Sequence, residues 1–143
     1  MNSKITISSF QSSRRVILAQ IELIFDHVGI PTDEVQPDED WVESTRVWVT
    51  SPRANKYRIE YLRYEPDTPC RAELVNLPHV AYQVHAEDLS ALIEGAEILS
   101  GPFVVDQNLT VAFIMKDGIP TEYMVYVDPD IWFGKRSPFS SPR

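Results

Sequence analysis

The chain has 143 residues, which is enough for one compact domain with its own core. Its 43% apolar and 24% charged residues are ordinary for a globular protein and exclude a collagen-like, low-complexity or largely disordered chain. Thirteen basic against twenty-one acidic residues give a net charge of −8, which argues against a nucleic-acid partner. Cys70 is the single cysteine, and no run approaches the ~20 apolar residues of a membrane span. We therefore expect a cytoplasmic protein with no membrane partner.

The two ends are polar and predict tails at residues 1–15 and 134–143, around a single domain at residues 16–133. Within that domain, short runs rich in β-branched and aromatic residues alternate with proline, glycine and aspartate, which predicts seven or eight strands. These runs are residues 20–30, 46–50, 57–64, 79–85, 102–105, 110–115 and 121–127.

Helical spacing of apolar residues is clearest in one segment. Leu89, Leu92, Ile93 and Ala96 recur at the intervals of a helix face, which predicts a helix over residues 86–99. Residues 38–44 are expected to add one or two further helical turns.

An internal repeat relates the two halves of the chain. The sequence DHVGI at residues 26–30 is echoed by PHVAY at residues 78–82, and IEYLRY at residues 59–64 is echoed by TEYMVY at residues 121–126. The repeated histidines are 52 positions apart and the repeated glutamates 62. This predicts two related half-units, at about residues 23–70 and 74–130, that bury their apolar faces against one another.

A strand containing His27-Val28, a second opening on His79-Val80, a helix, and final strands that include Gly118-Ile119-Pro120-Thr121-Glu122 resemble the glyoxalase, or vicinal oxygen chelate, superfamily. The resemblance implies an α+β fold in which two βαβββ modules pair into a curved mixed β-sheet cup around a divalent metal. It also implies one ligand from the first and one from the fourth strand of each module. The matching positions are His27, Glu60, His79 and Glu122.

One departure from the family pattern concerns the first module. Residues 30–46 leave room for only a shortened helix between its first two strands, and they include Pro31 and Pro37. The wall of the cup on that side is therefore expected to differ from that of other members.

The chemistry of the four candidate ligands supports a metal site independently. Two neutral imidazoles and two carboxylates can hold zinc, nickel, cobalt, manganese or iron and leave positions for water or substrate. A lone strand histidine is more often a hydrogen-bonded core residue, so the repeat-related positions of the four residues carry the prediction. His85 lies six positions after His79, roughly 20 Å along an extended strand, and cannot complete the same site.

The leading hypothesis is a metal-dependent lyase or isomerase that acts on a small oxygen-rich substrate through an enediolate or enolate, as the resemblance implies. Glu122 is the preferred catalytic proton shuttle and Glu60 the alternative. Arg58, Trp48 and Tyr126 are candidates for binding the substrate. Arg58 and Tyr126 share strand faces with the two glutamates, and Trp48 shares one with Arg46 and Thr50.

Two other classes of function remain open. One is a non-catalytic protein that binds a small, antibiotic-like molecule in an acidic cup, which agrees with the acidic body of the chain and its tyrosines. The resemblance implies that members of this kind lack the metal ligands, so the presence of all four favours a metal site instead. The other is an iron-dependent ring-cleaving dioxygenase, which requires two histidines and one carboxylate; the second carboxylate argues against it. Because the superfamily often pairs modules between chains, the resemblance also implies a homodimer as one arrangement.

Overall fold

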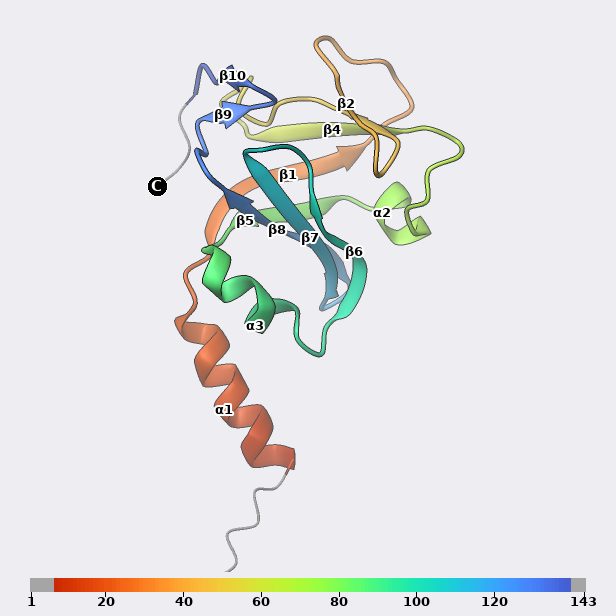
Figure 1. Ribbon diagram of the computed structural model, residues 1–143. Helices are drawn as coiled ribbons and strands as arrows, with labels where there is room; N and C mark the ends of the chain where they lie inside the picture. Colours follow the sequence, from red (N-terminus) through yellow and green to blue (C-terminus); the bar gives the residue numbers. More distant parts are fainter. Residues whose placement is uncertain (1–6, 140–143) are drawn as a thin grey trace, which may run out of the picture.

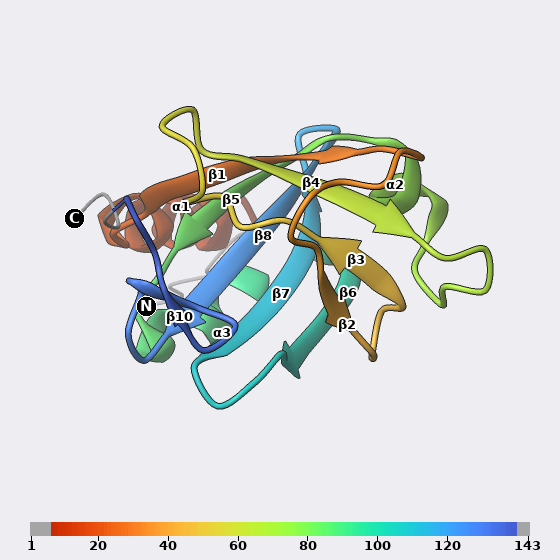
Figure 2. The ribbon, with the colours of Figure 1, turned by 90° about the horizontal axis from the view of Figure 1, so that it is seen from above.

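The computed structural model describes residues 7–139 and contains one eight-stranded mixed sheet. The sheet curls into an open half-barrel (Figures 1 and 2). Its strands, in chain order, are β1 (Ile24–Pro31), β2 (Asp40–Val42), β3 (Val47–Val49), β4 (Ile59–Tyr64), β5 (His79–Gln83), β6 (Glu97–Val104), β7 (Leu109–Lys116) and β8 (Ile119–Tyr126). This architecture confirms the prediction of an α+β chain with a curved mixed sheet.

The order of the strands in the sheet, β2-β3-β4-β1-β5-β8-β7-β6, has an internal symmetry. When strands β1, β2, β3 and β4 are taken as equivalent to β5, β6, β7 and β8, the order is the same from either edge of the sheet. Strand β1 pairs parallel with β4, β5 pairs parallel with β8, and the two halves meet where β1 pairs antiparallel with β5. The repeated segments DHVGI and PHVAY therefore lie side by side, in β1 and β5, at the centre of the sheet.

The helices are few and mostly short. They are α1 (Ile7–Gln20), α2 (Ala72–Asn76), the 3-10 turn η1 (Ala86–Asp88) and α3 (Leu89–Ile93). The predicted helix over residues 86–99 is therefore too long. Gly95, whose φ is 71°, turns the chain out of the helix, and residues from Glu97 onward pair with β7.

The expected N-terminal tail and the strand start at residue 20 are also corrected. Residues 7–15 belong to α1, and β1 begins only at Ile24. Near the end of the helix, Leu18 and Ile21 pack against a cluster on the outer face of the sheet, formed by Val84, Leu92, Ile114 and Tyr123. This contact anchors one end of α1, while the rest extends away from the sheet (Figure 1).

At the other end of the chain, part of the predicted C-terminal tail forms a small hairpin. Strands β9 (Ile131–Trp132) and β10 (Lys135–Arg136) pair antiparallel. Residues 1–6 and 140–143 of the two predicted tails lie outside the described part of the chain.

The helical turns expected at residues 38–44 are absent from the described chain, which forms strand β2 there. Trp41 pairs with Trp48 across the β2–β3 hairpin, with 4.9 Å between ring centroids, so cross-strand stacking prevails over local helix propensity. Between β1 and β2 the described chain has no helix, in line with the shortened first half.

The main hydrophobic core lies on the concave face of the sheet. In β3, Val47 and Val49 are buried there, and Leu62 of β4 and Met124 of β8 continue the same layer. No helix within residues 7–139 combines the length and the apolar character that crossing a bilayer requires.

Candidate metal centre

The four central strands each contribute one side chain to a buried cluster. These are His27 from β1, Glu60 from β4, His79 from β5 and Glu122 from β8, and each is 5% exposed or less. One ligand atom from each lies within 4.8 Å of the others. The structure therefore brings together all four residues that the sequence singled out, close enough to hold a metal ion.

The strand register explains why the four side chains meet. Val28 pairs with Val80 at the centre of the β1–β5 interface, so His27 lies opposite Ala81, and His79 opposite Gly29. On the outer sides, Gly29 also pairs with Glu60 and Ala81 with Glu122. Each histidine thus faces a small residue, and each glutamate lies beside that residue on the next strand.

The distances within this cluster suit a common central ion. Nε2 of His27 lies 3.3 Å from Oε1 of Glu60 and 3.4 Å from Oε1 of Glu122. Nε2 of His79 lies 3.5 Å and 3.1 Å from the same two oxygens. Ligands at ~2.1 Å from a tetrahedral ion are separated by about 3.4 Å.

One atom of the cluster lacks a conventional partner. Oε1 of Glu122 is buried and accepts no hydrogen bond from the described chain, although both imidazoles approach it. An orphaned buried carboxylate oxygen is costly unless a cation or hydrogen-bond donor compensates it. The residues present therefore fit a divalent metal ion.

Asp26, which the sequence analysis did not select, orients one of the ligands. Its Oδ2 lies 2.6 Å from Nδ1 of His27, so that nitrogen carries a proton and Nε2 faces the cluster. Oδ1 of Asp26 accepts hydrogen bonds from Gln83, at 2.8 Å, and from the fully buried Arg53. Metal-binding histidines are commonly held in this way by a carboxylate on their second ring nitrogen.

The charges of this region shift several pKa values. Burial by itself lowers the pKa of His27, but the negative charge of Glu60 and the hydrogen bond to Asp26 outweigh it and raise that pKa well above its usual value. Burial raises the pKa of Glu122, yet the neighbouring imidazoles of His27 and His79 lower it overall. The cluster is thus an electronegative pocket that favours positive charge at its centre.

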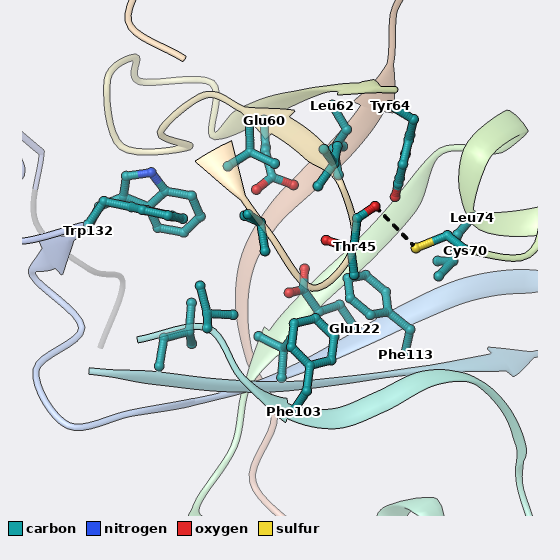
Figure 3. Close-up of a pocket in the computed structure, with 17 residues that line it drawn as sticks. Thr45, Glu60, Leu62, Tyr64, Cys70, Leu74, Phe103, Phe113, Glu122 and Trp132 are labelled. Carbon is teal, nitrogen blue, oxygen red and sulfur yellow. Dashed lines mark hydrogen bonds between the residues drawn. The ribbon is translucent and has the colours of Figure 1, made fainter. Parts of the chain in front are cut away.

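A largely apolar cavity opens above the glutamates (Figure 3). The empty space in and around it, including open solvent at its mouth, is about 470 Å³. The carboxylates of Glu60 and Glu122 point toward one another in its middle, Trp132 lies at one end, and Tyr64 and Cys70 lie at the other. A small molecule in this cavity would contact the metal ligands directly.

The structure does not bring the three predicted substrate-binding residues to the lining of this cavity. Trp48 alternates with the buried Val47 and Val49, so its indole faces the opposite side of the sheet and donates to Glu65 at 2.9 Å. Arg58 donates to the carbonyl of Asp26 at 2.6 Å, and the hydroxyl of Tyr126 accepts from Arg53 at 3.1 Å. These contacts give Arg58 and Tyr126 places in the network around Asp26.

His85 lies outside the cluster, as expected. It is exposed and pairs with Glu22 at 2.9 Å. Trp132 and Tyr64 line the cavity, and Asp26 and Arg53 support His27 from behind, although none of the four is a site residue predicted from the sequence. Asp26 could have been noticed because it directly precedes His27, whereas no pattern linked Arg53 to it.

Asn108 holds the segment that places Trp132 over the cavity. Its side chain donates to the carbonyls of Asp128 and Ile131, both at 2.9 Å, and accepts from the amide of Asp128 at 2.7 Å. We expect Asn108→Ala to lower the free energy of unfolding by about 1–3 kcal/mol, because it leaves these backbone groups unpaired. Urea unfolding measures this. Gln107→Ala, at the exposed neighbouring position, is the matched control, and equal losses for both would contradict the assignment.

No family model matches the chain, and no curated protein matches it either. The curled mixed half-barrel and the buried His/Glu cluster are compatible with a vicinal-oxygen-chelate-like fold.

Proposed function

We propose that this protein is a divalent-metal-dependent lyase or isomerase of the vicinal oxygen chelate type, acting on a small molecule with adjacent oxygen atoms. The observation that carries the proposal is the convergence of four buried ligand atoms, one of them an orphaned carboxylate oxygen, at the floor of a cavity. In this view, the two halves of the sheet descend from βαβββ modules, of which the first has lost its helix.

In the proposed site, His27, Glu60, His79 and Glu122 hold the ion. When bound, the ion supplies Lewis-acid stabilisation of negative charge on a substrate oxygen. His27 is held in place by Asp26, and the surrounding apolar walls exclude water from the substrate.

Glu122 is the proposed proton shuttle. Its carboxylate lines the cavity, and its Oε1 has no hydrogen-bond donor among the described residues to restrain it. A carboxylate in this position can accept a proton from a substrate carbon and return it to a neighbouring atom. Glu60 lines the cavity as well and is the alternative base.

Metal content tests the proposal directly. We expect the full chain, purified without chelator, to contain about one divalent ion per chain by plasma mass spectrometry. We expect His79→Ala and Glu122→Ala to lose that ion, because each removes one of four protein donors. His85→Ala is the matched control, since its imidazole is exposed and paired with Glu22.

Failure to bind metal after reconstitution with nickel, zinc, cobalt, manganese and iron would overturn the proposal. A non-catalytic small-molecule binding protein would then be the better account, and the cavity above the glutamates favours that second candidate. The second carboxylate ligand speaks against a ring-cleaving iron dioxygenase, whose site uses two histidines and one carboxylate.

A further inference from the structure

The walls of the cavity differ in character from its floor. Side chains from the two halves of the sheet face one another across it: Val49 and Leu62 from β3 and β4, and Val111 and Phe113 from β7. Phe103 of β6 and Trp132 of β9 add aromatic surface (Figure 3). A ligand that fills this space removes mostly apolar surface from water.

No lysine or arginine among residues 7–139 lines the cavity. The nearby cations contact carboxylates elsewhere: Arg53 pairs with Asp26 behind His27, Arg63 with Glu39 at 2.7 Å, and Arg71 with Glu97 at 2.8 Å. Two ionised glutamates and one divalent ion have a formal charge of zero. The floor therefore offers no excess positive charge to an anionic substrate.

The polar groups away from the floor are neutral. Burial raises the pKa of the Tyr64 phenol well above its usual value, and it also raises the pKa of the Cys70 thiol. Both side chains line the end of the cavity that Thr45 shares (Figure 3). This end can hydrogen-bond to a hydroxyl or carbonyl group, but it does not neutralise a carboxylate or phosphate.

We propose that the cavity selects an uncharged substrate, with an apolar and preferably aromatic body against its walls and its oxygen atoms over Glu60 and Glu122. The role of the oxygen atoms rests on the proposed metal function, whereas the selection against charge rests on the lining alone. Substrates that carry a phosphate, a nucleotide or a carboxylate on their body are excluded.

Three matched ligands test this selection: hydroxyacetone, 2-hydroxyacetophenone, and 4-(hydroxyacetyl)benzoate. They share one pair of adjacent oxygens and differ in a phenyl group and then in a carboxylate. Binding is followed by the methyl resonances of Val49 and Leu62 in NMR titrations of the full chain, both metal-free and loaded with zinc. We expect the phenyl group to strengthen binding at least about tenfold, and the carboxylate to remove that gain.

A pair of neighbouring valines supplies the control variants. Val105 lines the cavity, whereas Val104 is 68% exposed. We expect Val105→Lys to strengthen binding of 4-(hydroxyacetyl)benzoate at least about tenfold relative to 2-hydroxyacetophenone, because it places a cation in the cavity. We expect Val104→Lys to leave the ratio of the two affinities as in the unmodified chain.

The outcomes separate this inference from the proposed function. Equal affinity for the neutral and carboxylate ligands in the unmodified chain, or no gain from the phenyl group, overturns the inference even when zinc is bound. If the chain binds neither zinc nor nickel, cobalt, manganese or iron, the metal function fails. The preference for the neutral phenyl ligand in the metal-free titration then still supports the inference, and its absence there overturns it.

Discussion

We expect Gly29→Ala to weaken divalent-metal binding by about 10- to 100-fold, the range associated with misoriented metal ligands. A Cβ at this position would lie 2.0 Å from Cε1 of His79 and 2.4 Å from both ring nitrogens. The imidazole is 1% exposed and is bounded by the rings of Phe113 and His27, with centroids 5.3 and 5.4 Å away. It therefore has to leave the position from which its Nε2 reaches the cluster.

The same substitution overpacks the centre of the sheet, and we expect it to lower the free energy of unfolding by about 1–3 kcal/mol. Isothermal titration calorimetry with zinc measures the metal affinity, and urea unfolding measures the free energy of unfolding. Gly95→Ala is a suitable control, because its φ of 71° makes alanine unfavourable by about 1 kcal/mol while its surroundings are open. Unchanged zinc affinity in Gly29→Ala would show that the position of His79 does not depend on the absence of a side chain at residue 29.

We expect Asp26→Asn to lower metal affinity by about 10- to 100-fold and the free energy of unfolding by about 3–5 kcal/mol. The amide keeps the shape of the side chain but removes the charge that orients and polarises His27 through Nδ1. It also leaves Arg53, which is 0% exposed, without its buried carboxylate partner. Asp26 is not one of the four candidate ligands, so its effect on metal binding acts through His27.

A double variant separates the two effects of Asp26→Asn. In Asp26→Asn/Arg53→Met the buried cation is removed together with its partner, and replacement of a whole buried pair by apolar volume is often nearly neutral. We expect the double variant to regain most of the lost stability and to keep the weakened metal binding. Recovery of metal affinity together with stability would mean that Asp26 acts only on folding and does not position His27.

The four candidate ligands were predictable because they repeat. A histidine or a glutamate alone on a strand indicates little, but the pairs His27/His79 and Glu60/Glu122 occupy related positions in two similar segments. Side-chain alternation along a strand is a local property, so it also explains how related positions reach one face. The structure confirms their convergence.

The predicted substrate residues show the limit of the same reasoning. Alternation shows which residues share a face of a strand, but it does not show which face looks into the cavity. Trp48 lies on the face opposite Val47 and Val49, and Tyr126 and Arg58 contact the Asp26 network. Trp132 lines the cavity because hydrogen bonds from Asn108 hold the turn before it, and these two turns are distant in sequence.

The sequence by itself determined the strand-rich composition and the two related halves, because these depend on residue type and local periodicity. The four candidate ligands followed from the family resemblance at the repeated positions. Only the tertiary structure decided the pairing of β1 with β5, the gap at Gly29, the contact of Arg53 with Asp26 and the neutral apolar walls. It also decided that residues 97–99 extend a strand that pairs with β7. These features depend on contacts between distant segments, whose free energy exceeds the small local preferences that a single sequence displays.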